Sequence, residues 1–274
     1  MFERFEGWYF KQRCGADMLA FIPGRAADGA FVQMIGSGGT QRFFLPDFAA
    51  RGDTVRVGSC LFSPRGIRVR LPGVEGSLRY GALAPLRSDI MGPFAHLPMQ
   101  CRHGVVSMRH RVDGCITING TPHRFDGGSG YIEKDSGRSF PRAYLWVQCE
   151  RFPEPCALMF SAAHIPFLGA SFTGCICALL WQGTEYRFAT YRGVRIEELT
   201  PQRVRLRQGE FRLELDMRPL SDGHALAAPQ AGRMSATIRE SCNAALHLRL
   251  LRGGTLLLDT ESNEAAYEHR KAEQ

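Results

Sequence analysis

The chain has 274 residues, of which 44% are hydrophobic and 22% charged, and it carries a net charge of +7. These proportions are those of globular proteins, so they exclude an intrinsically disordered chain and leave room for one large domain or two smaller ones. The arginines are spread along expected strands, as in Ile67-Arg68-Val69-Arg70-Leu71, and form no basic run. This argues against a nucleic acid as partner and leaves open a transient contact with a membrane surface.

The cysteines and the N-terminal residues indicate a cytoplasmic protein with reduced thiols. Nine cysteines are present, an odd number without paired spacing, and the first residues are charged instead of forming an apolar signal segment. No apolar run reaches the ~18 residues that a transmembrane segment requires. Neither a metal nor a cofactor is expected, because Cys175-Ile176-Cys177 lacks the spacing of zinc ligands and Ile35-Gly36-Ser37-Gly38-Gly39 lacks the lysine and helix of a phosphate-binding loop.

Short segments rich in Val, Ile, Phe and Tyr, most of them bounded by Gly, Pro, Asp or Asn, predict strands along most of the chain. The expected strands are residues 5–11, 54–62, 66–71, 76–80, 114–119, 143–150, 156–164, 185–191, 203–207, 211–216, 234–239, 244–251 and 255–258. Turns are expected at Asp113-Gly114, at Asn119-Gly120 and at Arg252-Gly253-Gly254.

This pattern predicts an all-β fold, an antiparallel barrel or sandwich in two halves. The glycines at residues 127–130 suggest a seam, so we expect an N-terminal half at residues 1–128 and a C-terminal half at residues 129–274, with one continuous domain as the alternative. Residues 83–99, rich in proline, are expected to form a loop over one mouth of a barrel. The polar tail after Glu261 is expected to be partly helical.

The first segment with chemical character is residues 5–11. Strand alternation places Glu6, Trp8 and Phe10 on one face. A carboxyl group beside an indole in a dry pocket would favour its protonated form, as a general acid requires. The structural alternative is that Trp8 only plugs the floor of a barrel.

The second segment is residues 130–141, in which Tyr131, Glu133 and Asp135 share one face. The two carboxyl groups lie roughly 7 Å apart along an extended strand, close enough for one to raise the pKa of the other. Lys134 falls on the opposite face and is expected to be a structural partner there. The alternative is a charged edge strand that ends in a turn.

The third segment is residues 144–150, in which Tyr144, Trp146, Gln148 and Glu150 share one face. This mixture of aromatic, amide and carboxylate groups suits a pocket for an aromatic or cationic species. An amphipathic strand that faces outward is the alternative. We expect Trp8, Tyr131, Trp146 and Gln148 to point into one shared cavity.

Several of these segments resemble known blocks of one family. Residues 5–11 resemble the N-terminal EGW(Y/F) motif of the tocopherol cyclase-like family, and the resemblance extends to about residue 195. Its central blocks are similar to residues 90–94, 103–108, 130–135, 137–141, 146–148 and 171–174. Two positions depart from the family pattern: Ser136 stands where the family usually has tryptophan, and Glu150 where it usually has asparagine.

The resemblance implies a fold of two lipocalin-like halves, shared with carotenoid hydratases and AttH-type proteins. It implies an intramolecular lyase or isomerase that closes a ring in a prenylated quinol or a related isoprenoid. Glu133 or Asp135 would then supply the proton, with Glu6 as a further candidate. Trp8, Tyr131, Tyr144, Trp146 and Gln148 would bind the apolar ligand. Two alternatives remain, namely a non-catalytic carrier of a lipid or isoprenoid, and a hydratase of isoprenoid double bonds.

Overall fold

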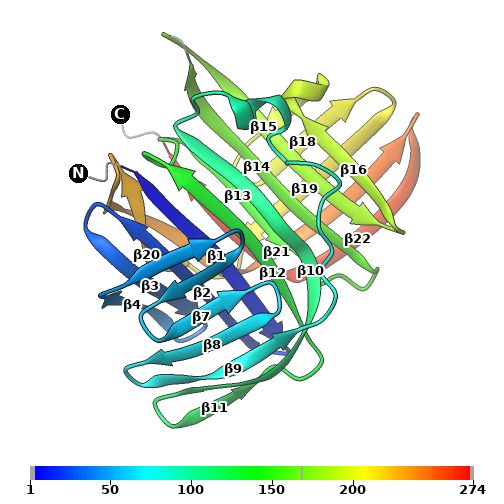
Figure 1. The fold of residues 1–274 in the computed structure, drawn as a ribbon. Helices are drawn as coiled ribbons and strands as arrows, with labels where there is room; N and C mark the ends of the chain where they lie inside the picture. The colour runs from blue at the N-terminus through cyan, green and yellow to red at the C-terminus, as the bar shows by residue number, and fades with distance from the viewer. Residues whose placement is uncertain (1–3, 168, 272–274) are drawn as a thin grey trace. The chain divides into compact units, whose positions relative to one another are not determined.

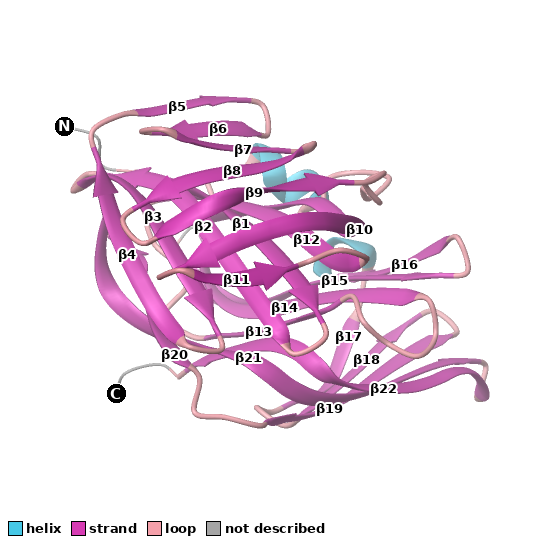
Figure 2. Ribbon diagram, turned by 90° about the horizontal axis from the view of Figure 1, so that it is seen from below, coloured by secondary structure: helices cyan, strands magenta, loops and turns pink. Residues whose placement is uncertain are grey.

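The computed structural model describes residues 4–167 and 169–271, in which almost all regular structure is antiparallel β-strand (Figures 1 and 2). The strands form two sheets, and two short 3₁₀-helices cover Gly92–His96 and Thr190–Arg192. The expectation of an all-β, antiparallel fold is therefore confirmed.

The first sheet has twelve strands, and β12 lies near its middle between β1 and β10. In spatial order the strands are β4 (Gly39–Leu45), β3 (Gly29–Gly36), β2 (Asp17–Ala26), β1 (Phe5–Cys14), β12 (Gly128–Gly137), β10 (Cys101–Ile118), β9 (Val74–Tyr80), β8 (Gly66–Leu71), β7 (Cys60–Ser63), β6 (Thr54–Val57) and β5 (Phe48–Arg51), with β11 (Thr121–Arg124) paired to β10.

The second sheet has ten strands and is also antiparallel. In spatial order they are β16 (Thr184–Ala189), β15 (Ala170–Trp181), β14 (Cys156–Phe167), β13 (Tyr144–Cys149), β22 (Thr255–Arg270), β21 (Arg233–Arg252), β19 (Phe211–Pro219), β18 (Arg203–Gln208) and β17 (Arg195–Leu199), with β20 (His224–Gln230) paired to β21.

The chain divides into two compact units whose segments alternate along the sequence. The first comprises residues 1–86, 101–140 and 226–237, and the second comprises residues 87–100, 141–225 and 238–274. The boundary expected between residues 128 and 129 falls at the start of β12, inside the first unit.

The core of the first unit lies between two parts of its own sheet. Phe62 on β7 packs against Phe10 on β1 and Phe21 on β2, with ring centroids 5.5 and 6.2 Å apart. The sheet therefore folds over itself, although its hydrogen-bonded order among the described residues stays open from β4 to β5. The unit is sandwich-like, and apolar side chains fill its interior.

The second unit has a separate apolar core formed by alternate residues of its strands, among them Leu145, Val147 and Cys149 of β13. Tyr186 on β16 packs edge-on against Phe211 on β19, with ring centroids 5.5 Å apart. Side chains at alternate positions are exposed along the first half of β21, as expected for a strand with one buried face.

Three local expectations were wrong. Residues 54–62 form two strands and not one, because Gly58 adopts φ +54° and turns the chain. Asp113-Gly114 lies inside the long strand β10 instead of forming a turn. The segment after Glu261 continues strand β22 to Arg270 and is not helical, because its backbone pairs with β21.

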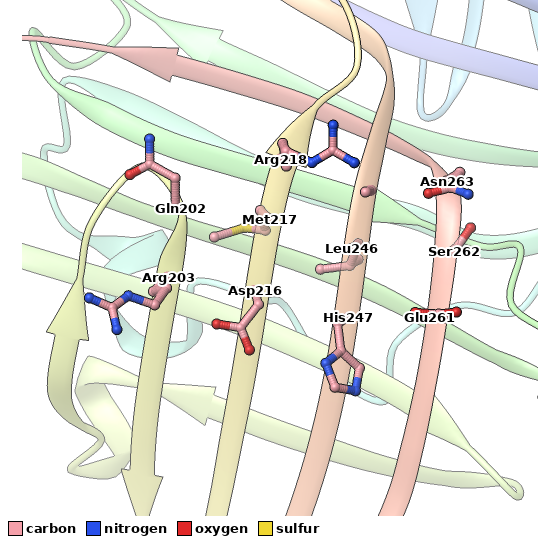
Figure 3. Close-up of a pocket in the computed structure, with 11 residues that line it drawn as sticks. Gln202, Arg203, Asp216, Met217, Arg218, Leu246, His247, Glu261, Ser262 and Asn263 are labelled. Carbon is pink, nitrogen blue, oxygen red and sulfur yellow. The ribbon is translucent and has the colours of Figure 1, made fainter.

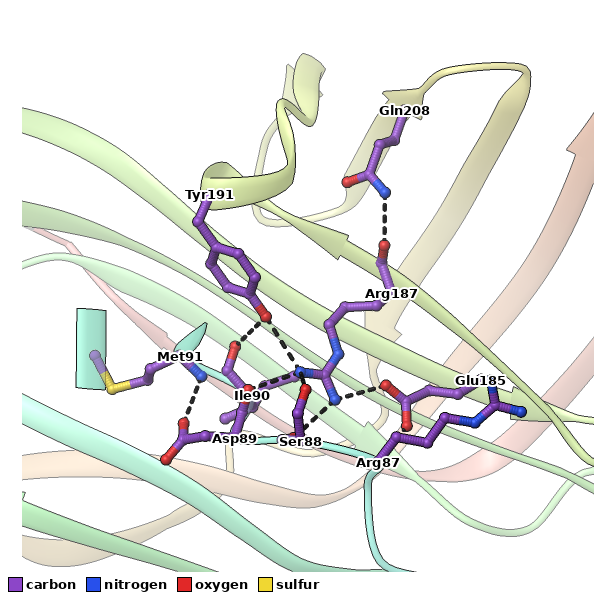
Figure 4. A network of polar contacts seen from close by, with 9 residues as sticks. All are labelled: Arg87, Ser88, Asp89, Ile90, Met91, Glu185, Arg187, Tyr191 and Gln208. Atoms are coloured by element: carbon purple, nitrogen blue, oxygen red, sulfur yellow. Dashed lines mark hydrogen bonds and ion pairs between the residues drawn. The ribbon is translucent and has the colours of Figure 1, made fainter. Parts of the chain in front are cut away.

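Residues 87–96 are held on the second unit by a buried arginine (Figure 4). Arg187 on β16 has no exposed side-chain surface and pairs with Glu185 at 2.6 Å. Its guanidinium also donates to the backbone oxygens of Ser88 (3.0 Å) and Asp89 (2.7 Å) and to the Tyr191 hydroxyl (3.2 Å). Sequence analysis expected an irregular loop at 83–99, and this network explains how part of it is fixed.

Candidate functional site

The central strand β12 brings the expected acidic residues together with side chains from both neighbouring strands. In the pairing with β1, Tyr131 lies opposite Lys11, and in the pairing with β10, Asp135 lies opposite His103. Directly opposed residues of an antiparallel pair share one face, and so do alternate residues of one strand. Tyr131, Glu133, Asp135, His103 and Lys11 therefore lie on the same face of the first sheet.

The side chains on this face form a continuous polar chain. The Tyr131 hydroxyl donates to Oε2 of Glu133 at 2.6 Å. That oxygen lies 3.5 Å from Nε2 of His103, whose Nδ1 lies 3.0 Å from Oδ1 of Asp135. Tyr131 is fully buried and Glu133 is 6% exposed. One imidazole, two carboxyl groups and a phenol at these distances can pass a proton from one group to the next.

The pKa of the Cys101 thiol reflects the negative charge of this cluster. Its thiol donates to Oδ1 of Asp135 at 3.7 Å. Burial holds the pKa of the Cys101 thiol well above its usual range, and the nearby carboxylates of Asp135 and Glu133 raise it further. The surroundings of these two acids thus disfavour additional negative charge.

His103, Glu133 and Asp135 are also of the types that bind divalent cations, and their candidate ligand atoms all lie within 4.8 Å of one another. The His103 ring, however, directs one nitrogen at each carboxyl group. The contact of Nδ1 with Asp135 is a hydrogen bond, and that of Nε2 with Glu133 is a longer polar contact, so each ring nitrogen already faces a carboxylate oxygen.

Trp8 lies on the opposite face of the same sheet. It is opposite Lys134 in the register of β1 with β12, and it is buried in the apolar core with Phe10 and Ile132. Trp8 and Tyr131 therefore cannot face one cavity, which corrects that expectation. The register of the two strands decides this, since Trp8 has the parity of Lys134 and not that of Tyr131.

Two other charged residues of the motifs are also turned away from the cluster. Glu6 lies opposite Ser136, on the Trp8 face, and pairs with Arg25 at 2.5 Å. Lys134 pairs with Asp53 at 2.6 Å, so the prediction that it acts as a structural partner on the other face is confirmed.

The remaining expected residues belong to the second unit, on β13. Tyr144, Trp146, Gln148 and Glu150 are all buried, and they share the face that is turned away from the apolar core of that unit. Gln148 donates to Oε2 of Glu150 at 3.0 Å, and the Tyr144 hydroxyl donates to Glu268 at 2.7 Å. The alternative of an outward-facing strand is therefore wrong for this segment, whose role in ligand binding stays a prediction.

A surface pocket of about 290 Å³ lies elsewhere on the second unit (Figure 3). Its lining comes from β19, β21 and β22 and from the start of β18, and it includes Arg203, Asp216, His247 and Glu261. None of the residues expected from the sequence lines it. Charged side chains of both signs take part in its lining.

Comparison with known families identifies the chain. Residues 74–269 match the model of a family described as tocopherol cyclase-like. The chain belongs to the tocopherol cyclase-like family. The matched range includes the whole of β12 with Tyr131, Glu133 and Asp135, and also His103.

Two curated relatives are plant proteins of the same family. A probable chloroplastic tocopherol cyclase of Oryza sativa subsp. japonica is 27% identical over 206 residues, which cover 69% of this chain and 44% of the rice protein. A chloroplastic tocopherol cyclase of Zea mays is 26% identical over 171 residues, which cover 57% of this chain and 36% of the maize protein. The chain thus spans less than half the length of these relatives.

Solved structures with the same fold are more distant in sequence. CghA has a TM-score of 0.63 at 14% identity, covering 98% of this chain and 89% of its own. A putative AttH from Nitrosomonas europaea has a TM-score of 0.56 at 14% identity, covering 98% and 93%. Kievitone hydratase from Nectria haematococca has a TM-score of 0.51 at 8% identity, covering 97% and 88%. These neighbours confirm the lipocalin-like fold expected for the tocopherol cyclase-like family.

The two departures from the family pattern lie outside the polar chain of β12. Ser136 is opposite Glu6, on the face turned away from Glu133. Glu150 is buried beside Gln148 in the second unit and accepts its hydrogen bond. The missing tryptophan at Ser136 therefore leaves the face with the two acids unchanged.

No helix in the described ranges combines the length and apolarity needed to cross a membrane. The two curated relatives are described as chloroplastic. A cytoplasmic location of this chain stays a prediction.

His103 is the residue of the cluster that sequence reasoning missed. It was visible only as one of eight histidines without ligand spacing. Its position depends on the pairing of β10 with β12, which brings it to Asp135 across a sequence separation of 32 residues. Its place in the segment that resembles the family's central block was the one available signal.

Proposed function

We propose that this chain is an enzyme that closes a ring in a prenylated quinol or a related isoprenoid by acid-initiated cyclisation. The observation that carries the proposal is the polar chain of Tyr131, Glu133, His103 and Asp135, with its first two members buried, in a tocopherol cyclase-like protein. Both curated relatives are named tocopherol cyclases, one of them as probable.

In this reaction the enzyme donates one proton to the substrate and later takes one proton back from it. A carboxylic acid adds its proton to the prenyl double bond and leaves a tertiary carbocation, which the phenol oxygen of the same molecule captures as the new C–O bond forms. The phenol proton then returns to the carboxylate, so the product is an isomer of the substrate. Exclusion of water is essential because water would compete for the cation.

Glu133 is the preferred proton donor among the three candidate acids. Its side chain is 8% exposed, compared with 19% for Asp135 and 24% for Glu6. Glu133 accepts a hydrogen bond from the Tyr131 hydroxyl and lies beside His103. After Glu133 has given its proton to the substrate, Asp135 can supply another through the His103 imidazole. Glu6 is engaged with Arg25 on the other face of the sheet, so we do not assign it a role in proton transfer.

The ligand-binding roles are assigned for each unit separately. The phenol of Tyr131 lies beside Glu133. We assign Tyr131 the role of binding the quinol or of stabilising the carbocation with its ring. Tyr144, Trp146 and Gln148 keep their predicted role as ligand-binding residues because their strand face is buried and combines aromatic and amide groups. Trp8 is excluded from this set because it fills the apolar core.

The test measures turnover and binding separately in the same variants. Glu133→Gln and Asp135→Asn are assayed with a prenylated hydroquinone, and Glu6→Gln serves as the matched control. We expect Glu133→Gln to lower the rate by about 10²–10⁴, the usual contribution of a general acid, while ligand binding is retained. Binding is followed by quenching of tryptophan fluorescence, and Glu6→Gln should keep most of the activity.

The remaining outcomes separate the alternatives. Full activity in both Glu133→Gln and Asp135→Asn would remove these acids from the mechanism. Tight binding of the quinol without any turnover in the unaltered protein would indicate a carrier. A product that has gained one water molecule would indicate a hydratase.

A further inference from the structure

The solvent-facing side of strands β5–β8 carries a group of arginines that no function proposed above uses. Buried and exposed side chains alternate strictly along β6 and β8, where Val55, Val57, Ile67 and Val69 point into the core. The exposed positions that alternate with them include Arg56 on β6 and Arg68 and Arg70 on β8. We call the group formed by Arg51, Arg56, Arg65, Arg68 and Arg70 the arginine face.

The strand register gathers these residues, although they are dispersed in the sequence. Arg56 lies opposite Leu61, and Leu61 lies opposite Arg68, on three successive strands. With neighbouring strands about 4.8 Å apart, Arg56 and Arg68 are about 10 Å from each other across the sheet, and Arg70 is about 7 Å further along β8. The arginines thus form a compact cluster on the surface, with Leu61, which is 38% exposed, between Arg56 and Arg68.

The positive charge of the arginine face is not neutralised within the part of the chain that the structure describes. None of its five members forms an ion pair there, and Glu75, opposite Arg70, is the one acidic residue at the solvent-facing positions of β6–β9. Asp53, which lies nearby in sequence, pairs with Lys134.

Several arginines of the second unit, by contrast, form ion pairs with nearby glutamates. Arg203 pairs with Glu198 at 3.0 Å, Arg212 with Glu197 at 3.3 Å and Arg252 with Glu210 at 3.0 Å. Protection of a sheet edge against aggregation does not explain the arginine face either, because only Arg51 stands on the edge strand β5.

We propose that the arginine face docks the protein on an anionic lipid surface. Guanidinium groups attract acidic headgroups within a Debye length of the surface. An exposed leucine among them can insert its side chain at the boundary between headgroups and acyl chains. A single-stranded nucleic acid fits less well, because no aromatic side chain stands at the described solvent-facing positions of β6–β9 to stack on bases. The proposal does not rest on the cyclase function.

The test uses vesicles of phosphatidylcholine with and without phosphatidylserine, and measures the bound fraction of the full chain by sedimentation. The variant Arg56→Gln/Arg68→Gln/Arg70→Gln removes three charges from the arginine face. Its matched control, Arg195→Gln/Arg207→Gln/Arg218→Gln, removes three exposed arginines of the second unit that also form no ion pair in the described structure. Both variants change the net charge equally.

Each arginine near an anionic surface contributes about five-fold in affinity, so the arginine-face variant should bind about 100-fold more weakly than the unaltered chain. The control variant should bind within about five-fold of the unaltered chain, since long-range attraction alone is weak in salt. Glu75→Gln should strengthen binding about five-fold, a gain that misfolding cannot produce.

Equal losses in the two triple variants, or equal binding to vesicles with and without phosphatidylserine, would overturn the proposal. So would binding of single-stranded DNA that depends on Arg56, Arg68 and Arg70 when the anionic vesicles are not bound.

Discussion

His103 and Asp135 are direct partners in the pairing of β10 with β12, and their side chains meet at 3.0 Å between Nδ1 and Oδ1. The same imidazole directs its other nitrogen at Glu133, 3.5 Å away. At this point β12 is paired on both sides, with Gly7 of β1 and His103 of β10 opposite Asp135, and this pairing holds the Asp135 backbone in place. A ring held in this way orients its proton toward one acid while it contacts the other.

His103→Gln should therefore lower turnover of the prenylated quinol by about 10²-fold or more, with little change in ligand binding. The matched control is His123→Gln, because His123 also pairs with an aspartate, Asp17, at 3.1 Å on the first sheet but outside the cluster. Steady-state rates of the two variants should differ by at least ten-fold. Equal rates would show that His103 has only a structural role.

The thiol of Cys101 provides a second measure of the cluster that needs no substrate. Burial and the neighbouring carboxylates raise its pKa, so little thiolate is present at neutral pH and alkylation by iodoacetamide should be slow. Asp135→Asn removes one negative charge, which lowers the thiol pKa, and alkylation at pH 8 should become several-fold faster. Burial, the largest cause, remains. Cys115, half-buried on the same strand, serves as the internal reference in mass-spectrometric mapping, and an unchanged ratio of the two rates would contradict this account.

The fold class could be predicted from the sequence because alternation of apolar and polar residues is a local property. The turns at Asn119-Gly120 and Arg252-Gly253-Gly254 could also be predicted, since Asn119 and the glycines adopt the positive φ that such turns require. Strand ends were less predictable. Nothing local distinguished Asp113-Gly114, which continues a strand, from Asn119-Gly120, which ends one.

The candidate site was only partly predictable for a related reason. Alternation correctly placed Tyr131, Glu133 and Asp135 on one face, because these three share a strand. Whether Trp8 shares that face depends on the register between β1 and β12, and a shift of one residue would have reversed the answer. His103 required the same long-range knowledge.

The backbone conformation at Gly92 explains the glycine in residues 90–94, one of the segments that resemble the family. Its φ is +53°, and a Cβ atom there would lie 2.6 Å from the ring of Tyr191. Gly92→Ala should therefore destabilise the protein by about 2–4 kcal/mol, from backbone strain and overpacking together. Gly15→Ala is the control, because Gly15 has φ +56° but open space around its Cβ position, and only the strain of about 1–2 kcal/mol should appear. Urea denaturation measures both, and equal losses would mean that the Tyr191 ring moves aside freely.

The buried pair of Arg187 and Glu185 predicts a large loss of stability when it is broken on one side. Arg187→Met leaves the Glu185 carboxylate, 6% exposed, without its cation and removes the donors to residues 88–89, so we expect a loss of about 3–5 kcal/mol in the free energy of unfolding. Adding Glu185→Gln should recover part of this loss, because an amide is less costly to bury than an unpaired charge.

Arg252→Met is the control. The pair of Arg252 with Glu210 is more than half exposed and is screened by water, so the loss of stability in this variant should be much smaller. Urea denaturation of the unaltered chain, Arg187→Met, Glu185→Gln and the double variant, followed by circular dichroism, gives the coupling energy between Arg187 and Glu185. A double variant no more stable than Arg187→Met alone would show that the anchoring of residues 88–89, and not the buried charge, sets the contribution of Arg187.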